Sequence, residues 1–362
     1  MSGERLQSLY DYEALATQTL EPMARAYFGG AARDRLTLAA NRAAWDQISL
    51  WYKVLVDVSK RDTSTTILGT RLKMPILVAP TAFHGLAHGD AETATVRASE
   101  QAGTVACIST LSNVDLESLA EVGVGPLWFQ LYVYRDRGVT AALVRRAEAA
   151  GYQALVVTVD AAEIGTREED HRNRFHLPEG LRAANLMSSG LDTIPEAADG
   201  SGLNDYVRRL LDPSLTWTDI DWLSSLTNLP IVIKGLIRSD DALRAYDHGA
   251  AAVIVSNHGG RQLDTAPSTA QALPYVVDAV GDKVEVLVDG GIRRGTDIVK
   301  ALALGARAVL IGRPVLWGLA CDGQRGVEDV LNLLAGELTE AMALCGCPSI
   351  DSISSELLTP GH

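Results

Sequence analysis

The segment Ser256–Asp264, with the sequence SNHGGRQLD, places an imidazole, a guanidinium and two glycines close together. It directly follows the apolar run Ala251–Val255, which is typical of a buried parallel strand. His258 offers a proton acceptor, Arg261 offers a clamp for an anion, and the glycines let a ligand approach the backbone. Judged from this segment alone, a packed structural role for His258 is as well supported as a catalytic one. The residues at the other strand ends decide between these two roles.

Short apolar runs recur from residue 75 onward, each followed by a polar or glycine-rich turn and an amphipathic stretch. This alternation predicts a parallel sheet covered by helices, and eight units favour a closed (β/α)8 barrel, a TIM barrel, of the α/β class. No G-x-G-x-x-G motif follows an early strand, which disfavours a dinucleotide-binding fold. The predicted strands are Ile76–Ala79, Thr104–Ile108, Leu127–Val133, Ala154–Asp160, Ile231–Lys234, Ala252–Ser256, Val286–Asp289 and Ala308–Gly312.

The interval between the fourth and fifth predicted strands is much longer than one βα unit requires. Within it, residues 175–215 are rich in small and polar side chains and predict a mobile lid over the C-terminal mouth of the barrel. We expect one domain over residues 1–362, with an N-terminal cap of helices and a short hairpin (1–70), the barrel (75–320) and C-terminal helices (321–362).

The composition is that of a soluble globular protein, with 47% apolar and 21% charged residues. The net charge of −13 argues against nucleic-acid binding, which requires a basic surface. The first residues lack the apolar core of a signal peptide, and no run approaches membrane-spanning length. The four cysteines show no metal-binding spacing. We therefore expect a cytoplasmic protein with reduced thiols, no metal and no membrane partner.

Glycine-rich turns follow the last two predicted strands, at Asp289–Arg293 (DGGIR) and at Gly312-Arg313. In a barrel this position is the usual phosphate site, because the exposed backbone N–H groups can bind phosphate oxygens. Arg293 and Arg313 add positive charge. A phosphate-bearing cofactor or substrate is the inference, with tight structural turns as the alternative.

Five polar residues end other predicted strands and suit a flat heterocycle with donors and acceptors. An isoalloxazine ring fits, because a lysine can stabilise the negative charge that collects at its N1 and O2 atoms on reduction. The alternative role, which we expect for one or two of these residues, is hydrogen bonding to polar groups at the strand ends. The set is Thr81, Ser109, Gln130, Thr158 and Lys234.

The remaining groups indicate substrate chemistry. Arg261 and Arg167 can together hold a carboxylate with bidentate geometry. His258 can act as a base, with Asp160 orienting its ring and stabilising its cation. This combination implies removal of hydrogen from the carbon next to a carboxylate. Acidic neighbours at 168–170 leave a surface salt bridge as the alternative role for Arg167.

The chain resembles the FMN-dependent α-hydroxy acid oxidases and dehydrogenases, which include glycolate, lactate and hydroxymandelate oxidases. The resemblance runs from residue 12 to about residue 352, with plant-type glycolate oxidase the most similar. Its motifs are APTA (79–82), WFQLY (128–132), TVD (158–160), RNRF (172–175), IKG (233–235), SNHGGRQLD (256–264) and DGGIRRG (289–295).

The resemblance implies FMN as cofactor and a role for each matching residue. His258 takes the substrate proton and Asp160 pairs with it, while Tyr132 contacts the substrate hydroxyl. Tyr27, outside the barrel, joins the two arginines at the carboxylate. The residues implied to line the flavin are Pro80, Thr81, Ala82, Ser109, Gln130, Thr158, Lys234 and Ser256. Those implied to hold its ribityl phosphate are Asp289, Gly291, Arg293, Gly312 and Arg313.

Three departures from the glycolate oxidase pattern concern the pocket and the turn after the fourth strand. Leu111 replaces a tryptophan beside the substrate, Ala161-Ala162 replaces a turn that usually contains proline, and Thr166 replaces an arginine. The predicted pocket wall, with Phe83, Leu111 and Ile164, therefore favours a 2-hydroxy acid bulkier than glycolate, either aliphatic or aromatic.

The resulting hypothesis is oxidation of an L-2-hydroxy acid to the 2-oxo acid, with dioxygen reduced to hydrogen peroxide by a homotetramer or octamer. A dehydrogenase using a quinone or other acceptor, and a decarboxylating monooxygenase, are alternatives. The sequence does not distinguish hydride transfer from a carbanion route. Two further alternatives are a flavin-free isomerase or aldolase, with Lys234 as its reactive residue, and a non-catalytic binding protein.

Overall fold

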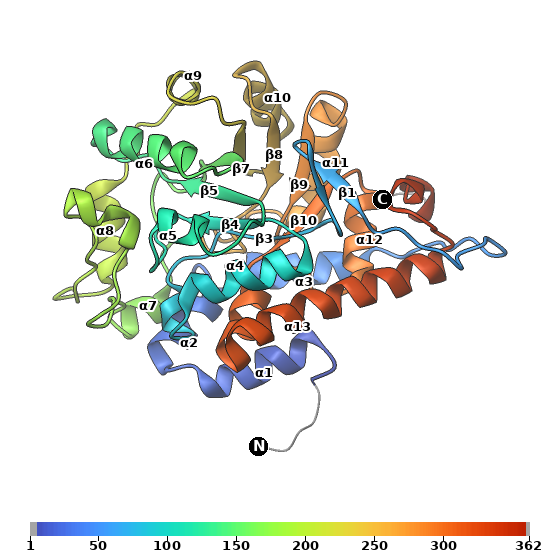
Figure 1. The fold of residues 1–362 in the computed structure, drawn as a ribbon, viewed down its shortest axis with the longest axis horizontal. Coiled ribbons are helices and arrows are strands. Elements are labelled where there is room, and N and C mark those ends of the chain that lie inside the picture. Colours follow the sequence, from blue (N-terminus) through green and yellow to red (C-terminus); the bar gives the residue numbers. More distant parts are fainter. Residues whose placement is uncertain (1–5, 360–362) are drawn as a thin grey trace.

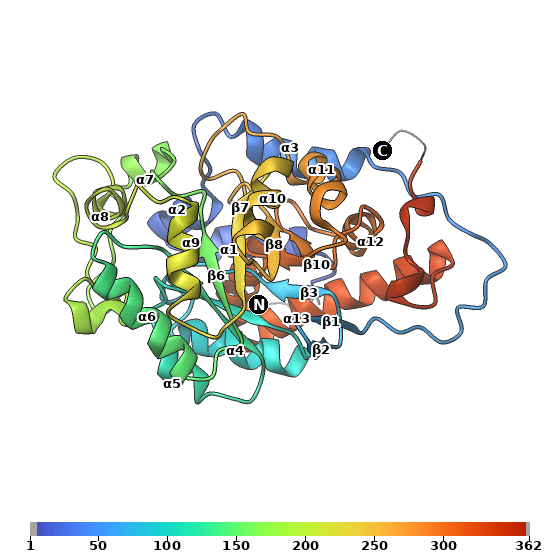
Figure 2. The ribbon, with the colours of Figure 1, turned by 90° about the horizontal axis from the view of Figure 1, so that it is seen from above.

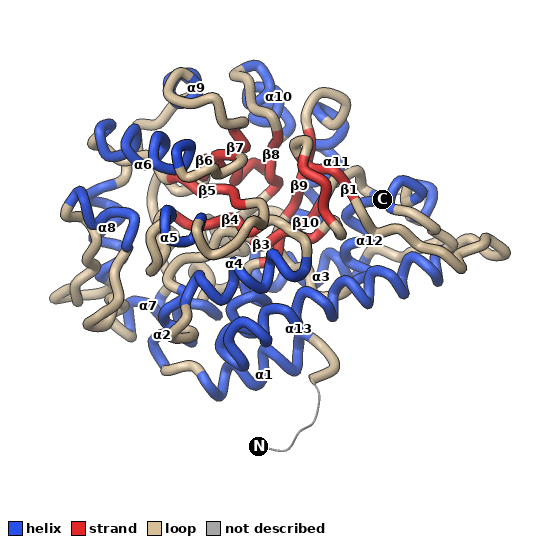
Figure 3. The backbone as a smooth tube through the Cα atoms, in the orientation of Figure 1, coloured by secondary structure: helices blue, strands red, loops and turns tan. Residues whose placement is uncertain are grey.

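The computed structural model describes residues 6–359 of the chain, and its centre is a closed barrel of eight parallel strands (Figures 1 and 3). Neighbouring strands pair in chain order, and the last strand, β10, closes the barrel against β3. The (β/α)8 prediction is therefore confirmed. The strands are β3 (Ile76–Val78), β4 (Ala106–Ser109), β5 (Leu127–Leu131), β6 (Ala154–Thr158), β7 (Ile231–Leu236), β8 (Ala252–Val255), β9 (Glu285–Val288) and β10 (Ala308–Ile311).

The barrel interior is a packed apolar core that excludes water. Successive side chains of a strand point to opposite faces, so alternate residues of each strand fill the interior. Leu77, Trp128, Val156 and Ile254 belong to this buried cluster. A two-stranded hairpin, β1 (Thr65–Ile67) and β2 (Thr70–Leu72), contributes Ile67 and Leu72 to the same cluster. The predicted N-terminal hairpin thus closes one end of the barrel and leaves the other for chemistry.

Helices surround the barrel and bury their apolar faces against the strands (Figure 2). The outer helices are α4 (Ala91–Ala102), α5 (Leu116–Ala120), α6 (Arg137–Ala149), α9 (Trp217–Ser224), α10 (Ser239–Asp247), α11 (Thr269–Val280), α12 (Gly295–Ala303) and α13 (Arg313–Cys345). Helix α13 is interrupted at Asp322 and Gly323, where the backbone is not helical. Of the three N-terminal helices, α1 (Leu9–Thr19) packs against α13, α2 (Pro22–Gly29) against α7 (Glu168–Arg172), and α3 (Leu36–Gln47) against α11.

The predicted lid is more structured than its composition suggests. The long connection after β6 contains α7 (Glu168–Arg172), a 3-10 turn (Ala184–Ser189) and α8 (Gly202–Leu210). Phe175, Leu186 and Tyr206 are almost completely buried and anchor it to the core. Helix α8 forms because Leu203, Tyr206 and Val207 give it an apolar face, which the neighbouring glycines, serines and aspartates hide in the sequence.

Several strands end one or two residues earlier than predicted, so Tyr132 and Asp160 lie just beyond β5 and β6. Side chains at these positions still follow the inward direction of the strand before them. Within residues 6–359, no helix is both long and apolar enough to cross a membrane.

Candidate active site

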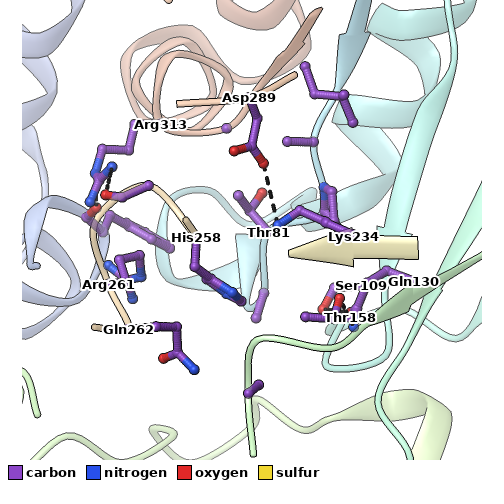
Figure 4. A pocket seen from close by; sticks show the side chains of 18 of the residues that line it. Thr81, Ser109, Gln130, Thr158, Lys234, His258, Arg261, Gln262, Asp289 and Arg313 are labelled. Carbon is purple, nitrogen blue, oxygen red and sulfur yellow. Dashed lines mark hydrogen bonds and ion pairs between the residues drawn. The ribbon is translucent and has the colours of Figure 1, made fainter. Parts of the chain in front are cut away.

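The polar residues at the strand ends continue the inward faces of the barrel strands. Moving two residues along a strand keeps a side chain on the same face, so Trp128 in the core leads to Gln130, and Val232 leads to Lys234. These side chains line one cavity at the C-terminal mouth. Figure 4 shows Ser109, Gln130 and Thr158 on one side of it, with Arg261 and Arg313 on the other.

A hydrogen-bonded pair, His258 and Asp160, lies at the edge of this cavity. His258 Nδ1 lies 2.9 Å from Asp160 Oδ1. An ionised carboxylate can only accept, so Nδ1–H donates and Nε2 is left with a lone pair. Burial acts to raise the pKa of Asp160. The interactions with His258 and Lys234 have the larger combined effect, so the pKa lies below its usual value. With the imidazole in its neutral form, Nε2 can accept a proton, and the neighbouring carboxylate can stabilise the cation that forms.

The backbone around His258 is constrained by close contacts. His258 itself has a φ of 57°, a left-handed conformation that costs free energy in a non-glycine residue and that the surrounding structure must maintain. Its N–H donates to Ser256 Oγ at 3.1 Å. Gln262 Nε2 donates to the carbonyl of Asp160 at 2.7 Å, and its Oε1 accepts from Gly165 N at 3.0 Å. Gln262 thus ties the His258 segment to the turn after β6.

Lys234 is a buried ammonium in the middle of the site. Its Nζ lies 3.3 Å from Asp289 Oδ2 and 3.0 Å from Ser256 Oγ. Burial acts to lower the pKa of Lys234, but Asp289 and Asp160 outweigh burial and raise it. The lysine therefore stays protonated. This form can stabilise negative charge, whereas a lysine that forms a Schiff base must lose its proton.

A cluster of one tyrosine and two arginines forms the end of the cavity next to His258. The guanidinium carbons of Arg261 and Arg167 lie 5.0 Å and 5.6 Å from the centre of the Tyr27 ring. Burial lowers the pKa of Arg261 to about 10, and the nearby charge of Arg167 adds to this decrease. Asp170, only 1% exposed, pairs with Arg167 Nε at 3.1 Å. The buried guanidinium of Arg167 and the half-buried guanidinium of Arg261 outnumber the one carboxylate, and the net positive charge favours binding of an anion.

A second positively charged region of the cavity lies next to this cluster, around Arg313 and Arg293. Arg313 donates to the carbonyls of Phe28, Gly259 and Gly30 at 3.1, 3.0 and 2.8 Å, with no carboxylate among these partners. Burial, together with Arg261 and Arg293, holds the pKa of Arg313 well below its usual value. Burial also lowers the pKa of Arg293 to about 10. An anion placed here would relieve this repulsion.

Amide and hydroxyl groups form the side of the cavity near β4, β5 and β6. Gln130 Nε2 donates to Thr158 Oγ1 at 3.0 Å, and Gln130 Oε1 accepts from Ser109 Oγ at 3.3 Å and from Thr110 N at 3.2 Å. These contacts fix which atom of Gln130 faces each neighbour. The network therefore offers a preset pattern of donors and acceptors to a polar ring.

Most residues predicted for the site line this cavity. Pro80, Thr81, Ala82, Leu111, Tyr132, Ile164, Gly291 and Gly312 do so together with the residues described above. Asp160 and Ser256 lie behind the lining and contact it through His258 and Lys234. Phe83 is not part of the wall, contrary to our prediction: it is fully buried and its ring lies 5.8 Å from that of Tyr27.

Part of the wall was missed by sequence reasoning. Leu203 and Val207 of α8, and Leu211 just after it, line the cavity opposite the strand ends. Their spacing of four residues is the signal that could have identified them, because it places all three on one helical face.

Comparison with known proteins identifies the family of this chain. Residues 16–360 match the family model described as FMN-dependent dehydrogenase. The chain belongs to the FMN-dependent dehydrogenase family. It is 54% identical to L-lactate oxidase from Nostoc sp. over 97% of both chains. It is 48% identical to human 2-hydroxyacid oxidase 1, covering 98% of this chain and 96% of the relative.

A solved structure of mandelate oxidase with (S)-4-hydroxymandelic acid is also similar, with a TM-score of 0.93, 43% identity and 98% of both chains covered. The family and the cofactor expected from the sequence are therefore confirmed.

The residues of this cavity fit FMN. Asp289 Oδ1 is buried and lacks a hydrogen-bond partner among the described residues, so a ribityl hydroxyl could supply one. Arg293 and Arg313 provide charge for a phosphate beside the glycine-rich turns. Gly290 and Gly291 have φ values of 95° and 83°, which a residue with a side chain rarely adopts. If the glycines served only to form tight turns, the guanidiniums of Arg293 and Arg313 beside them would have no explanation.

Proposed function

We propose that this protein is an (S)-2-hydroxy-acid oxidase, which oxidises an L-2-hydroxy acid to the 2-oxo acid and passes the electrons to dioxygen, forming hydrogen peroxide. The observation that carries this proposal is one cavity in which the hydrogen-bonded His258–Asp160 pair lies beside Arg167 and Arg261. The relatives named as oxidases support the choice of dioxygen over a quinone.

In the proposed reaction, Arg261 and Arg167 hold the substrate carboxylate, which places the 2-hydroxy carbon beside His258. His258 Nε2 takes a proton from the substrate, and Asp160 stabilises the imidazolium that results. FMN, when bound, supplies the acceptor for two electrons. Lys234 stabilises negative charge in the middle of the cavity.

Tyr132 has its pKa raised by burial and by the nearby Asp160 charge, so it stays protonated. It is therefore available to hydrogen-bond the substrate hydroxyl throughout the reaction.

We further propose a cytoplasmic protein that assembles as a homotetramer or octamer. The domain limits are likewise proposals: an N-terminal cap (1–70), a barrel (75–320) with its lid, and C-terminal helices (321–362).

The test is anaerobic mixing of the flavin-loaded protein with a panel of L-2-hydroxy acids, followed by admission of air. We expect the flavin absorbance to bleach, then to return with formation of one peroxide per 2-oxo acid. The His258→Ala variant should bind FMN but bleach at least a hundredfold more slowly, the lower end of a typical acid–base contribution of about 10²–10⁴. A colourless protein, or normal bleaching by this variant, would refute the assignment.

A further inference from the structure

A second cavity adjoins the proposed active site. It lies between the C-terminal ends of β5, β6 and β7 and helix α9, which runs beside β6 and β7 in Figure 2. Four residues, Tyr132, Thr158, Ala161 and Leu211, line both cavities. We call this second cavity the side chamber. Because the two share a wall beside the substrate position, the side chamber is the space into which a longer substrate can extend.

The side chamber is predominantly apolar. Its volume is about 430 Å³, which lies within the range of small-molecule sites. Apolar side chains make up most of the surface that is not shared with the active site: Val133, Val159, Ala162, Leu215, Trp217, Ile220 and Leu236. A hydrocarbon group placed there would leave water for an apolar surface, which is favourable at about 0.8 kcal/mol per methylene.

The charged groups of the side chamber exclude a second carboxylate. Among the residues that the structure describes, its charged lining consists of Asp212 and Asp241, without lysine, arginine or histidine. Hydrogen bonding to Ser214 and the nearby Arg137 hold the pKa of Asp212 below its usual value, so it stays ionised. Arg137 Nη2 pairs with Asp212 Oδ2 at 2.7 Å but does not line the side chamber, so a negatively charged tail would meet the carboxylates of Asp212 and Asp241 first.

The wall that the two cavities share includes small or flexible groups. Ala161 contributes only a methyl group, and Leu211 follows the last turn of α8 in the lid. A tail that passes between them leaves the arginine cluster free to hold the carboxylate at the other end of the molecule.

We infer that the side chamber is a binding subsite for the uncharged hydrocarbon tail of a monocarboxylic 2-hydroxy acid several carbons longer than lactate. This inference rests on the proposed function, because it assumes that the carboxylate end is held by Arg167 and Arg261. It assigns the substrate class by one property, an apolar tail, and excludes dicarboxylic 2-hydroxy acids.

The test measures the efficiency of anaerobic flavin reduction by lactate, 2-hydroxybutanoate, 2-hydroxyhexanoate, 2-hydroxyoctanoate and 2-hydroxyglutarate. For the unaltered protein we expect efficiency to rise about fourfold for each of the first methylenes that enter the side chamber. We expect 2-hydroxyglutarate to be a poor substrate. A flat dependence on chain length, or efficient use of 2-hydroxyglutarate, would overturn the inference.

Two matched variants locate the effect. Leu215→Trp fills the side chamber from a residue that does not line the active site, whereas Leu243→Trp makes the same change on exposed α10, lining neither cavity. We expect Leu215→Trp to abolish the gain with chain length and to leave lactate unchanged, and Leu243→Trp to change neither. The opposite change, Trp217→Ala, enlarges the side chamber and should shift the preferred tail to a longer chain.

The outcomes separate this inference from the proposed function. If no 2-hydroxy acid bleaches the flavin in any variant, the proposed function fails. If lactate is oxidised but Leu215→Trp leaves the chain-length dependence intact, only the tail subsite fails. If Leu215→Trp slows reoxidation by dioxygen equally for every substrate while that dependence is intact, the side chamber carries oxygen and the inference is wrong.

Discussion

Replacing Asp160 by asparagine tests the role of the carboxylate behind His258. Asparagine has nearly the same shape, and its side-chain oxygen can still accept from Nδ1, so the hydrogen bond survives and the charge does not. The change therefore isolates the electrostatic part of the interaction.

The magnitude follows from the geometry of the pair. Nδ1 and Oδ1 are 2.9 Å apart, and the side chains of Asp160 and His258 are only 13% and 25% exposed. Losing the charge from a hydrogen bond of this kind costs about 1.5–3 kcal/mol when the imidazolium forms. We expect the rate of flavin reduction to fall by roughly 10- to 150-fold.

The assay is anaerobic stopped-flow reduction of the Asp160→Asn variant by lactate, with flavin content measured on the same sample. Asp240→Asn is a matched control, because Asp240 pairs with Arg238 on the exposed surface. A reduction rate within threefold of the unaltered protein, in a variant fully loaded with FMN, would contradict the assignment of Asp160 as the partner of the base.

Three further predictions concern other parts of the site and its support. Gly235→Ala should lose at least tenfold in turnover while still binding FMN, because a Cβ at this position (φ 111°) would lie 2.7 Å from Asp160 Cγ; full activity would disprove the contact. Arg313→Met should weaken FMN binding about 10- to 150-fold, measured as flavin content after dialysis, since a hydrogen bond to a charged group contributes about 1.5–3 kcal/mol; unchanged content would place the phosphate elsewhere. Burial raises the pKa of Glu92 to about 7 and lowers that of His84 to about 4. The stability from Glu92 is lost as the pH rises towards 7, whereas that from His84 is lost as the pH falls towards 4, so the two oppose each other. Glu92→Gln should therefore make the free energy of unfolding rise more steeply between pH 4 and 6.5, measured by urea denaturation; a flatter dependence would refute the raised pKa of Glu92.

The sequence predicted the barrel and the strand-end part of the site because both depend on local pattern. The apolar runs alternate with helical segments, and the two-residue period carries the inward face from Val232 to Lys234 and from Trp128 to Gln130. Once barrel closure is assumed, these side chains must converge, and they line one cavity in the structure.

Other parts of the site depend on tertiary contacts that leave little trace in local pattern. Tyr27 comes from α2, outside the barrel, and only the resemblance identified it. The close approach of Gly235 to Asp160 occurs where the pairing of β7 with β8 is irregular, between Lys234 and Leu236. Phe83 was predicted as pocket wall from the family resemblance, but its φ of 62° belongs to a backbone that turns it into the core behind Tyr27.

The carbonyl of Gly30 accepts from both Arg261 and Arg313, at 2.9 Å and 2.8 Å. One backbone oxygen near the start of the chain therefore joins the arginine proposed for the substrate to the arginine proposed for the phosphate. During synthesis, neither contact can form until the last third of the polypeptide, which contains both arginines, has been made. A chain in which these contacts have not yet formed lacks both anion sites. Binding of the yellow cofactor therefore reports that the N-terminal segment has joined the last part of the barrel.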